Sequence, residues 1–164
     1  MIILGIDPGV ATVGIGVIEY SGNRFRVLRC GVITTDKDLS LPDRLKIIYE
    51  ETTQVIEEFH PDVVSIEELF FNNNVTTAIM VAQGRGVSIL SAINAGLPIY
   101  EYTPLQVKQA VTGYGRAQKA QVQHMVKTLL GLRAIPRPDD AADALAIAIC
   151  HAHSYRYQEL TGGN

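Results

Sequence analysis

The 164-residue chain has no long apolar run and only two cysteines. No stretch is long enough to cross a bilayer as a helix, so we expect no contact with a membrane. The apolar N-terminal run is interrupted at Asp7 and carries no basic leader, which argues against a signal peptide. Cys30 and Cys150 lie far apart in apolar contexts, and we interpret both as buried, reduced thiols of a cytoplasmic protein.

The chain also lacks a strong net charge, because its formal charge at pH 7 is only −3. Residues 1–68 contain 12 acids and 6 bases, and residues 139–164 contain four acids and one base. Between them, residues 69–138 contain seven bases and a single acid, Glu101. Such a basic block can bind a phosphate backbone whatever the total charge. The alternative is a solvated basic face without a partner.

Patterns of apolar and turn residues predict an α/β fold. Three strands over 2–7, 13–20 and 25–35 are joined by short links and should be antiparallel. Strands over 62–68 and 97–102 each follow a helical segment, so they should run parallel in the same sheet. The helical segments lie between Ser40 and Pro61 and over 75–95, 104–112, 119–132 and 139–155. We therefore predict one domain over 1–156, built on a five-stranded mixed sheet flanked by helices, and a disordered tail at 157–164.

Acidic residues stand at the ends of these predicted elements. Asp7 ends the first strand, Glu67 and Glu68 end the fourth, and the last helix opens with Asp139, Asp140 and Asp143. If the first and fourth strands are parallel neighbours, Asp7 and Glu67 stand side by side and repel each other unless a cation compensates them. Oxygen ligands without a His or Cys pair suit Mg²⁺ or Mn²⁺. Four carboxylates can hold two such ions, the arrangement that hydrolyses phosphodiesters.

Each acid alone has a structural explanation. Asp7 could cap a turn, Glu67 and Glu68 could face solvent, and acids in the first turn of a helix favour its macrodipole. The acids and the basic block nevertheless explain each other if the block draws in a nucleic-acid backbone that the carboxylates hydrolyse.

Five motifs resemble those of the RuvC Holliday junction resolvases over nearly the whole chain: GIDPG…GIGVI, SIEELFF, QVKQAVTG, KAQVQHMV and DDAADALAIAI. This resemblance implies an RNase H-like fold and a homodimer that places two symmetric nicks in a four-way DNA junction during recombination and repair. It also implies 5′-phosphate and 3′-hydroxyl ends, a T-rich cutting preference, and partnership with the RuvA–RuvB branch-migration complex.

The resemblance also assigns roles to residues. The metal-binding catalytic carboxylates are Asp7, Glu67, Asp140 and Asp143, which would hold two Mg²⁺ ions, with Mn²⁺ as a substitute. Lys119 would lie near the scissile phosphate as a further catalytic residue. For DNA binding the resemblance implies Phe70, which would stack on a base, and Lys108. We add Arg85 and Arg116 as DNA-binding candidates because they belong to the basic block. Asp139 and Glu68 leave a shift of one residue open in the ligand set.

Structural alternatives remain for several of these residues. Phe70 and Phe71 could belong to the core or a dimer interface, and Lys119 could be a solvated lysine at a helix start. We interpret His151 as a packing residue and Glu101 as serving the fold. Three rival functions are an actin-like phosphate-binding ATPase lobe, a YqgF-type nuclease and a junction-binding module without catalysis. The acidic opening of the last helix argues against the ATPase lobe, and KAQVQHMV argues against the YqgF type.

Overall fold

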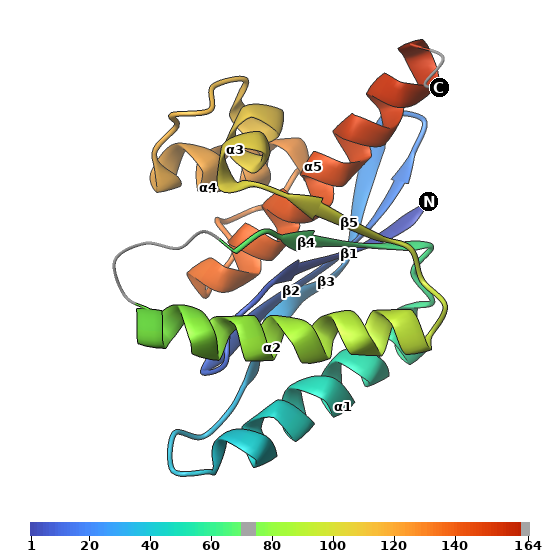
Figure 1. Ribbon diagram of the computed structural model, residues 1–164. Helices are drawn as coiled ribbons and strands as arrows, with labels where there is room; N and C mark the ends of the chain where they lie inside the picture. The colour runs from blue at the N-terminus through green and yellow to red at the C-terminus, as the bar shows by residue number, and fades with distance from the viewer. Residues whose placement is uncertain (70–74, 162–164) are drawn as a thin grey trace.

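The structure is a computed structural model that describes residues 1–69 and 75–161, with side chains described through residue 156 (Figure 1). Its strands are β1 (Ile2–Asp7), β2 (Thr12–Ser21), β3 (Arg24–Thr34), β4 (Val63–Glu67) and β5 (Ile99–Tyr102). Its helices are α1 (Leu41–Phe59), α2 (Val75–Asn94), α3 (Pro104–Thr112), α4 (Lys119–Leu129) and α5 (Asp139–Thr161). Helix α5 extends over residues 157–161, which we expected to belong to a disordered tail. Residues 162–164 lie outside the described part of the chain.

The five strands form one mixed sheet in the order β3-β2-β1-β4-β5. Strand β1 is antiparallel to β2, and β2 is antiparallel to β3. Strand β4 runs parallel to both β1 and β5. This confirms the mixed sheet expected from the short early links and the later helical crossovers. The carboxyl ends of β1 and β4 therefore meet at one edge of the sheet, where Asp7 and Glu67 end their strands.

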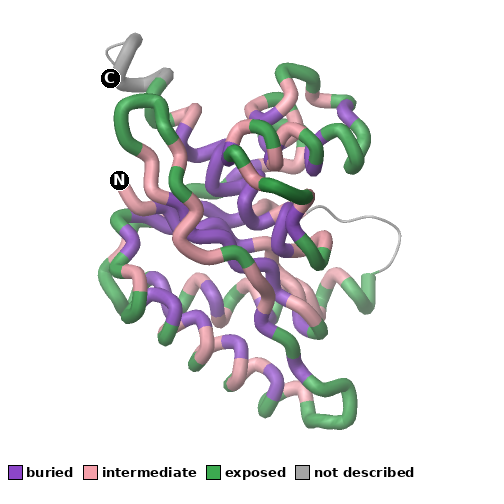
Figure 2. Tube along the Cα trace, turned by 180° about the vertical axis from the view of Figure 1, so that it is seen from behind, coloured by how far each residue is buried: buried purple, intermediate pink, exposed green. Residues whose placement is uncertain are grey.

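Helices cover both faces of the sheet, with α1 and α2 on one side and α3, α4 and α5 on the other (Figure 1). The alternation of side chains along β1 explains these two layers, because Ile3 packs toward α5 whereas Leu4 and Ile6 pack toward α1 and α2. Figure 2 shows the buried residues gathered in the sheet and on the helix faces that pack against it. Each fully buried isoleucine contributes about 1.5–3 kcal/mol relative to an exposed one.

Glycines allow α5 to lie unusually close to the sheet. A β-carbon on Gly5 or Gly14 would overlap the backbone carbonyl of Ala144 or Asp140, and one on Gly16 would meet the amide of Leu145 at 2.8 Å. Without side chains at these positions, the first turns of α5 can contact the strands directly. This close packing brings Asp140 and Asp143 to the sheet edge where β1 ends.

The helix starts follow their capping residues. Ser40 caps α1 by accepting a bond from the amide of Asp43, and Thr103 forms a capping box with Gln106 at the start of α3. Gln118 and Gln121 form the corresponding pair at the start of α4. That pair makes Lys119 the first residue of α4.

The remaining structural predictions have mixed outcomes. Cys150 is buried, but Cys30 is exposed, so the prediction for Cys30 is wrong. The reason is that β3 is an edge strand and the helices cover it only partly. His151 is a buried packing residue as predicted, with its Nδ1 2.8 Å from the Tyr102 hydroxyl. No helix in the described part of the chain has both the length and the apolar character needed to span a membrane.

Candidate active site

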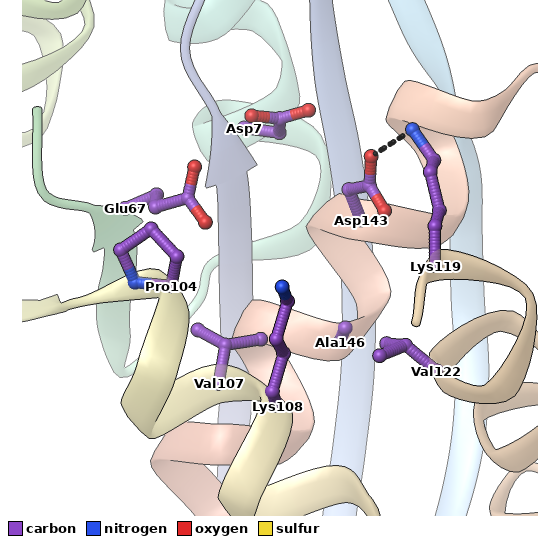
Figure 3. Close-up of a pocket in the computed structure, with 9 residues that line it drawn as sticks. All are labelled: Asp7, Glu67, Pro104, Val107, Lys108, Lys119, Val122, Asp143 and Ala146. Carbon is purple, nitrogen blue, oxygen red and sulfur yellow. Dashed lines mark hydrogen bonds and ion pairs between the residues drawn. The ribbon is translucent and has the colours of Figure 1, made fainter. Parts of the chain in front are cut away.

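A cavity of about 230 Å³ opens where β1 and β4 end. Its acids come from three elements: Asp7 from β1, Glu67 from β4 and Asp143 from α5. Lys108 of α3 and Lys119 of α4 also line it, and the rest of the wall is Pro104, Val107, Val122 and Ala146. Figure 3 shows the three carboxylates and two lysines directed toward a common space. Residues distant in the sequence therefore form one acidic site with a cationic rim.

The position of the acids follows from the sheet register. Ile6 of β1 lies beside Ile66 of β4 in the parallel pair, so the next residue of each strand is an acid at the same level. Pro8 and Gly9 follow Asp7 outside the strand, and β1 ends there. The side-by-side arrangement of Asp7 and Glu67 predicted from the sequence is thus confirmed by the strand pairing.

The carboxylates perturb one another strongly. Burial, together with the charges of Glu67, Asp143 and Asp140, raises the pKa of Asp7 to about 8. Burial and the charge of Asp143 raise the pKa of Glu67 to about 6, although Lys108 and Lys119 oppose this shift. Negative charge at this site is therefore costly unless a cation compensates it.

Lys119 supplies part of that compensation. Its ammonium donates to Asp143 across 2.9 Å and lies 3.5 Å from Asp139, and both contacts raise the pKa of Lys119. Burial raises the pKa of Asp143, while the bond from Lys119 opposes the rise. Asp139 also pairs with Arg137 at 2.5 Å. Two cations therefore engage Asp139 outside the cavity, whereas Asp143 faces into it.

Asp140 and Glu68, the two remaining candidates for metal ligands, lie at the border of the cavity or outside it. Asp140 is half-buried and does not line the cavity, but its charge raises the pKa values of Asp7 and Asp143. Glu68 is half-buried, and its amide donates to the carbonyl of Tyr102 at 2.9 Å. Its side chain does not line the cavity either. The geometry thus brings Asp7, Glu67 and Asp143 together, with Asp140 at their border.

The donor chemistry fits a hard divalent cation. Every candidate ligand is a carboxylate, and burial and mutual repulsion have raised the pKa of each of the three that line the cavity. Over residues 1–69 and 75–161, no three His, Cys, Asp or Glu side chains lie close enough together to hold an ion as they stand. The Asp143 carboxylate accepts a hydrogen bond from the Lys119 ammonium in this arrangement.

The predicted DNA-binding residues fall into different environments. Lys108 lines the cavity, and Arg116 is exposed in the segment before α4. Arg85 is turned inward: its side chain is only 14% exposed and forms an ion pair with Glu101. Phe70 and Phe71 lie outside the described residues. DNA binding by these side chains stays a prediction.

Three features of the site were missing from the sequence prediction. Val107 and Val122 are cavity walls as well as core residues, and an apolar residue on a helix indicates the core alone. The contact between Arg85 and the end of β4 joins residues 18 positions apart in different elements. The close approach of α5 depends on Gly5, Gly14 and Gly16, and the alternate spacing of Gly14 and Gly16 along β2 was the available signal.

This sheet order, with carboxylates at two neighbouring strand ends and at the start of the last helix, defines the RNase H-like class of folds. A family model described as "Crossover junction endodeoxyribonuclease RuvC" matches residues 3–151. The chain belongs to this RuvC family.

Curated relatives agree over almost the whole length. The chain is 61% identical over 160 residues to the crossover junction endodeoxyribonuclease RuvC of Alkaliphilus oremlandii, covering 98% of each chain. It is 57% identical over 164 residues to the protein of that name from Ruminiclostridium cellulolyticum, covering 100% of this chain and 99% of the relative.

Solved structures also resemble the chain. A Thermus thermophilus RuvC structure superimposes with a TM-score of 0.90 at 39% identity, covering 96% of each chain. RuvC of the same organism in complex with a Holliday junction substrate gives a TM-score of 0.92 at 38% identity, covering 99% of this chain and 97% of that one. The yeast mitochondrial Holliday junction resolvase Ydc2 shares the fold, with a TM-score of 0.71 at 13% identity.

Proposed function

We propose that this chain is a structure-selective endodeoxyribonuclease that resolves four-way DNA junctions by paired symmetric nicks, in DNA recombination and repair. The observation that carries the proposal is the cavity in which Asp7, Glu67 and Asp143 converge beside Lys119. The family match over residues 3–151 supplies the class of reaction. A protein acting on chromosomal DNA in this way works in the bacterial cytoplasm.

Membership in the family implies a divalent-metal dependence, and the carboxylates are the residues that would hold the metal. We assign Mg²⁺, two ions per site, to Asp7, Glu67, Asp140 and Asp143, with Mn²⁺ as a substitute. When bound, such ions supply an activated water and stabilise the leaving oxygen of a phosphodiester. The raised pKa values of Asp7 and Glu67 support this assignment, because a cation would offset the repulsion that causes them.

Two lysine side chains of the chain would bind the phosphate. Lys119 reaches the cavity from the start of α4 and Lys108 reaches it from α3. Lys119 would donate from its place at the cavity to a non-bridging oxygen of the scissile phosphate. Lys108 neutralises backbone charge on the other wall. The products would carry 5′-phosphate ends.

The basic block of residues 69–138 supplies the side chains that would bind DNA. Arg116 is exposed beside the cavity's helices, where it can bind backbone phosphate in a salt-dependent manner. Phe70 would stack on a base near the junction centre, as the family resemblance implies. Binding by these side chains would recognise the shape of the junction and the negative charge of the DNA backbone.

A second copy of the chain completes the enzyme, because two symmetric nicks need two active sites. The outer face of α2 supports a homodimer: it exposes four apolar side chains at helical spacing, Val75, Ile79, Leu90 and Ile93. Gly86 lies on the same face, is exposed and has open space around it, which lets a partner helix approach closely. Cooperation with a RuvA–RuvB branch-migration complex follows from the family.

Junction binding and cleavage test the proposal together. The chain is mixed with a labelled synthetic four-way junction or a linear duplex of the same sequence, in Mg²⁺ or in chelator. We expect tighter binding to the junction in both conditions and cleavage of the junction only with metal. Equal affinity for the two DNAs at moderate salt, or cleavage in chelator, would contradict it. Junction binding without cleavage in Mg²⁺ or Mn²⁺ would instead identify a binding module.

A further inference from the structure

Arg85 connects three elements beneath the end of β4. It lies on α2, and its Nε donates to the backbone carbonyl of Glu67 at 3.0 Å. Its Nη2 forms an ion pair with the carboxylate of Glu101 on β5. The guanidinium therefore binds the main chain of the residue whose carboxylate lines the cavity. It does so from the sheet face opposite α3, α4 and α5 (Figure 1).

The end of β4 needs such support. The ladder between β4 and β1 ends at Ile66, so the pairing of Glu67 itself is with Tyr102 of the short edge strand β5. On that side the amide of Glu68 donates to the carbonyl of Tyr102 at 2.9 Å. The bond from Arg85 adds a charge-assisted contact on the carbonyl of Glu67 itself.

The burial of Arg85 favours this role over a DNA contact. Its side chain is 14% exposed, whereas that of Glu101 is 50% exposed. A guanidinium removed from water is stable only when its charge is paired and its donors are used. Here Nε and Nη2 are used on β4 and β5, and the low exposure leaves the side chain poorly placed to meet a phosphate backbone.

We propose that Arg85 and Glu101 are positioning residues that fix the main chain at Glu67 and so hold its carboxylate in the active site. This inference rests on the proposed function, because it takes Glu67 as a metal-binding carboxylate. Arg85 touches neither metal nor substrate, and Glu101 acts through Arg85 by orienting the guanidinium.

The first test compares Arg85→Gln, Arg85→Lys and Glu101→Gln in the full-length chain. For Arg85→Gln we expect kcat on a four-way junction to fall about 10–100-fold and half-saturating Mg²⁺ to rise severalfold. KM and the junction Kd should stay within about twofold. Glu101→Gln should change the same quantities in the same direction by less, because the bond from Arg85 to Glu67 survives.

Arg85→Lys separates positioning from DNA binding. Lysine keeps the charge but lacks the planar fork that binds two acceptors at once. A phosphate contact would therefore survive in Arg85→Lys, and Arg85→Gln would weaken junction binding and lower its salt dependence. That pattern would overturn the inference. Should Arg85→Gln fail to fold, the same measurements of kcat, half-saturating Mg²⁺ and junction Kd on Arg85→Lys and Glu101→Gln test the inference.

The matched control is the ion pair between Arg26 and Glu19, which joins β3 and β2 at 2.8 Å far from the cavity. Arg26→Gln and Glu19→Gln remove the same chemical groups and should leave kcat and the Mg²⁺ requirement unchanged. If these variants lower kcat as much as Arg85→Gln does, a general loss of structure explains the effect and the inference is wrong.

Two readouts do not depend on cleavage. Mn²⁺ affinity of the DNA-free protein, measured by electron paramagnetic resonance, should fall severalfold in Arg85→Gln. Hydrogen exchange at the amide of Glu68 should become faster, because that amide's bond to β5 depends on the same strand end. Unchanged Mn²⁺ affinity and unchanged exchange would overturn the inference. If the unmodified chain does not nick junctions, the proposed function fails, while these two measurements still decide whether Arg85 positions Glu67.

Discussion

The Nζ atom of Lys119 lies 2.9 Å from Oδ2 of Asp143 (Figure 3). This contact pairs the lysine we expect to meet the scissile phosphate with a carboxylate we expect to hold metal. The lysine offsets part of the negative charge of the acidic site, because its charge opposes the rise in the pKa values of Asp7 and Glu67.

Removing that lysine should affect turnover more than stability. For Lys119→Ala we expect kcat to fall about 100-fold, the typical cost of losing one donor to transition-state charge. The Lys119 side chain is 55% exposed, so its ion pairs should contribute no more than about 1 kcal/mol to the free energy of unfolding. Single-turnover cleavage and thermal melting measure the two effects, with Lys127→Ala on the same helix as the control. A large fall in melting temperature with normal turnover would overturn the assignment.

Asp7→Asn should abolish cleavage and preserve junction binding. The carboxylate serves the metal, while the grip on DNA comes from the basic block. We expect no detectable nicking in Mg²⁺ and a junction Kd within about threefold of the unmodified chain. Gel-shift binding and cleavage of the same labelled junction provide both values. Nicking by Asp7→Asn would remove Asp7 from the catalytic set.

Stability in chelator should fall as pH rises from about 4 to about 8. The pKa of Asp7 rises from 3.8 unfolded to about 8 folded, so between these values the folded chain keeps a proton that the unfolded chain has released. The unfolded state then binds fewer protons, and the free energy of unfolding decreases with pH. Glu67, with its pKa raised from 4.5 to about 6, adds to the decrease at the acidic end of this range.

Thermal melting between pH 5 and pH 8.5, in chelator, measures how steeply the free energy of unfolding decreases with pH. Asp7→Asn should make this decrease less steep and should stabilise the metal-free chain at pH 8 by roughly 1–3 kcal/mol. Addition of Mg²⁺ should raise the melting temperature of the unmodified chain most at high pH, where the carboxylates are ionised. The same slope in both proteins would show that Asp7 is not the group whose proton is retained.

A charge on the outer face of α2 should separate the homodimer. Leu90 is 49% exposed on that face, and Leu90→Lys should give the mass of a single chain in analytical ultracentrifugation. Leu39→Lys is the matched control, because Leu39 is similarly exposed but precedes α1. If Leu90→Lys stays dimeric, the interface lies elsewhere.

The sheet and the acids at its edge could be predicted from the sequence because local patterns determine them. Alternating apolar residues, short links and helical crossovers fixed the strand directions, and the parallel pairing then placed Asp7 beside Glu67. Asp143 was among the acids that open the last helix, and resemblance to a family added Lys119; the two approach each other through the packing of α4 against α5.

Other features depend on tertiary geometry that no local pattern reports. Cys30 was wrongly predicted to be buried because coverage of an edge strand depends on helix placement. Arg85 resembled any other base of the block, yet its partners are Glu101 and a backbone carbonyl in other elements. The extension of α5 to Thr161 shows that a polar C-terminal sequence can continue a helix begun in the core.

The most direct test of the central claim is to map both nicks on one synthetic four-way junction, with each strand labelled in turn. In Mg²⁺ we expect cuts at the same position in two opposite strands, with ligatable 5′-phosphate ends, and none in chelator. Cuts confined to one strand, or spread equally over all four arms and over linear duplex, would contradict a symmetric junction-resolving nuclease.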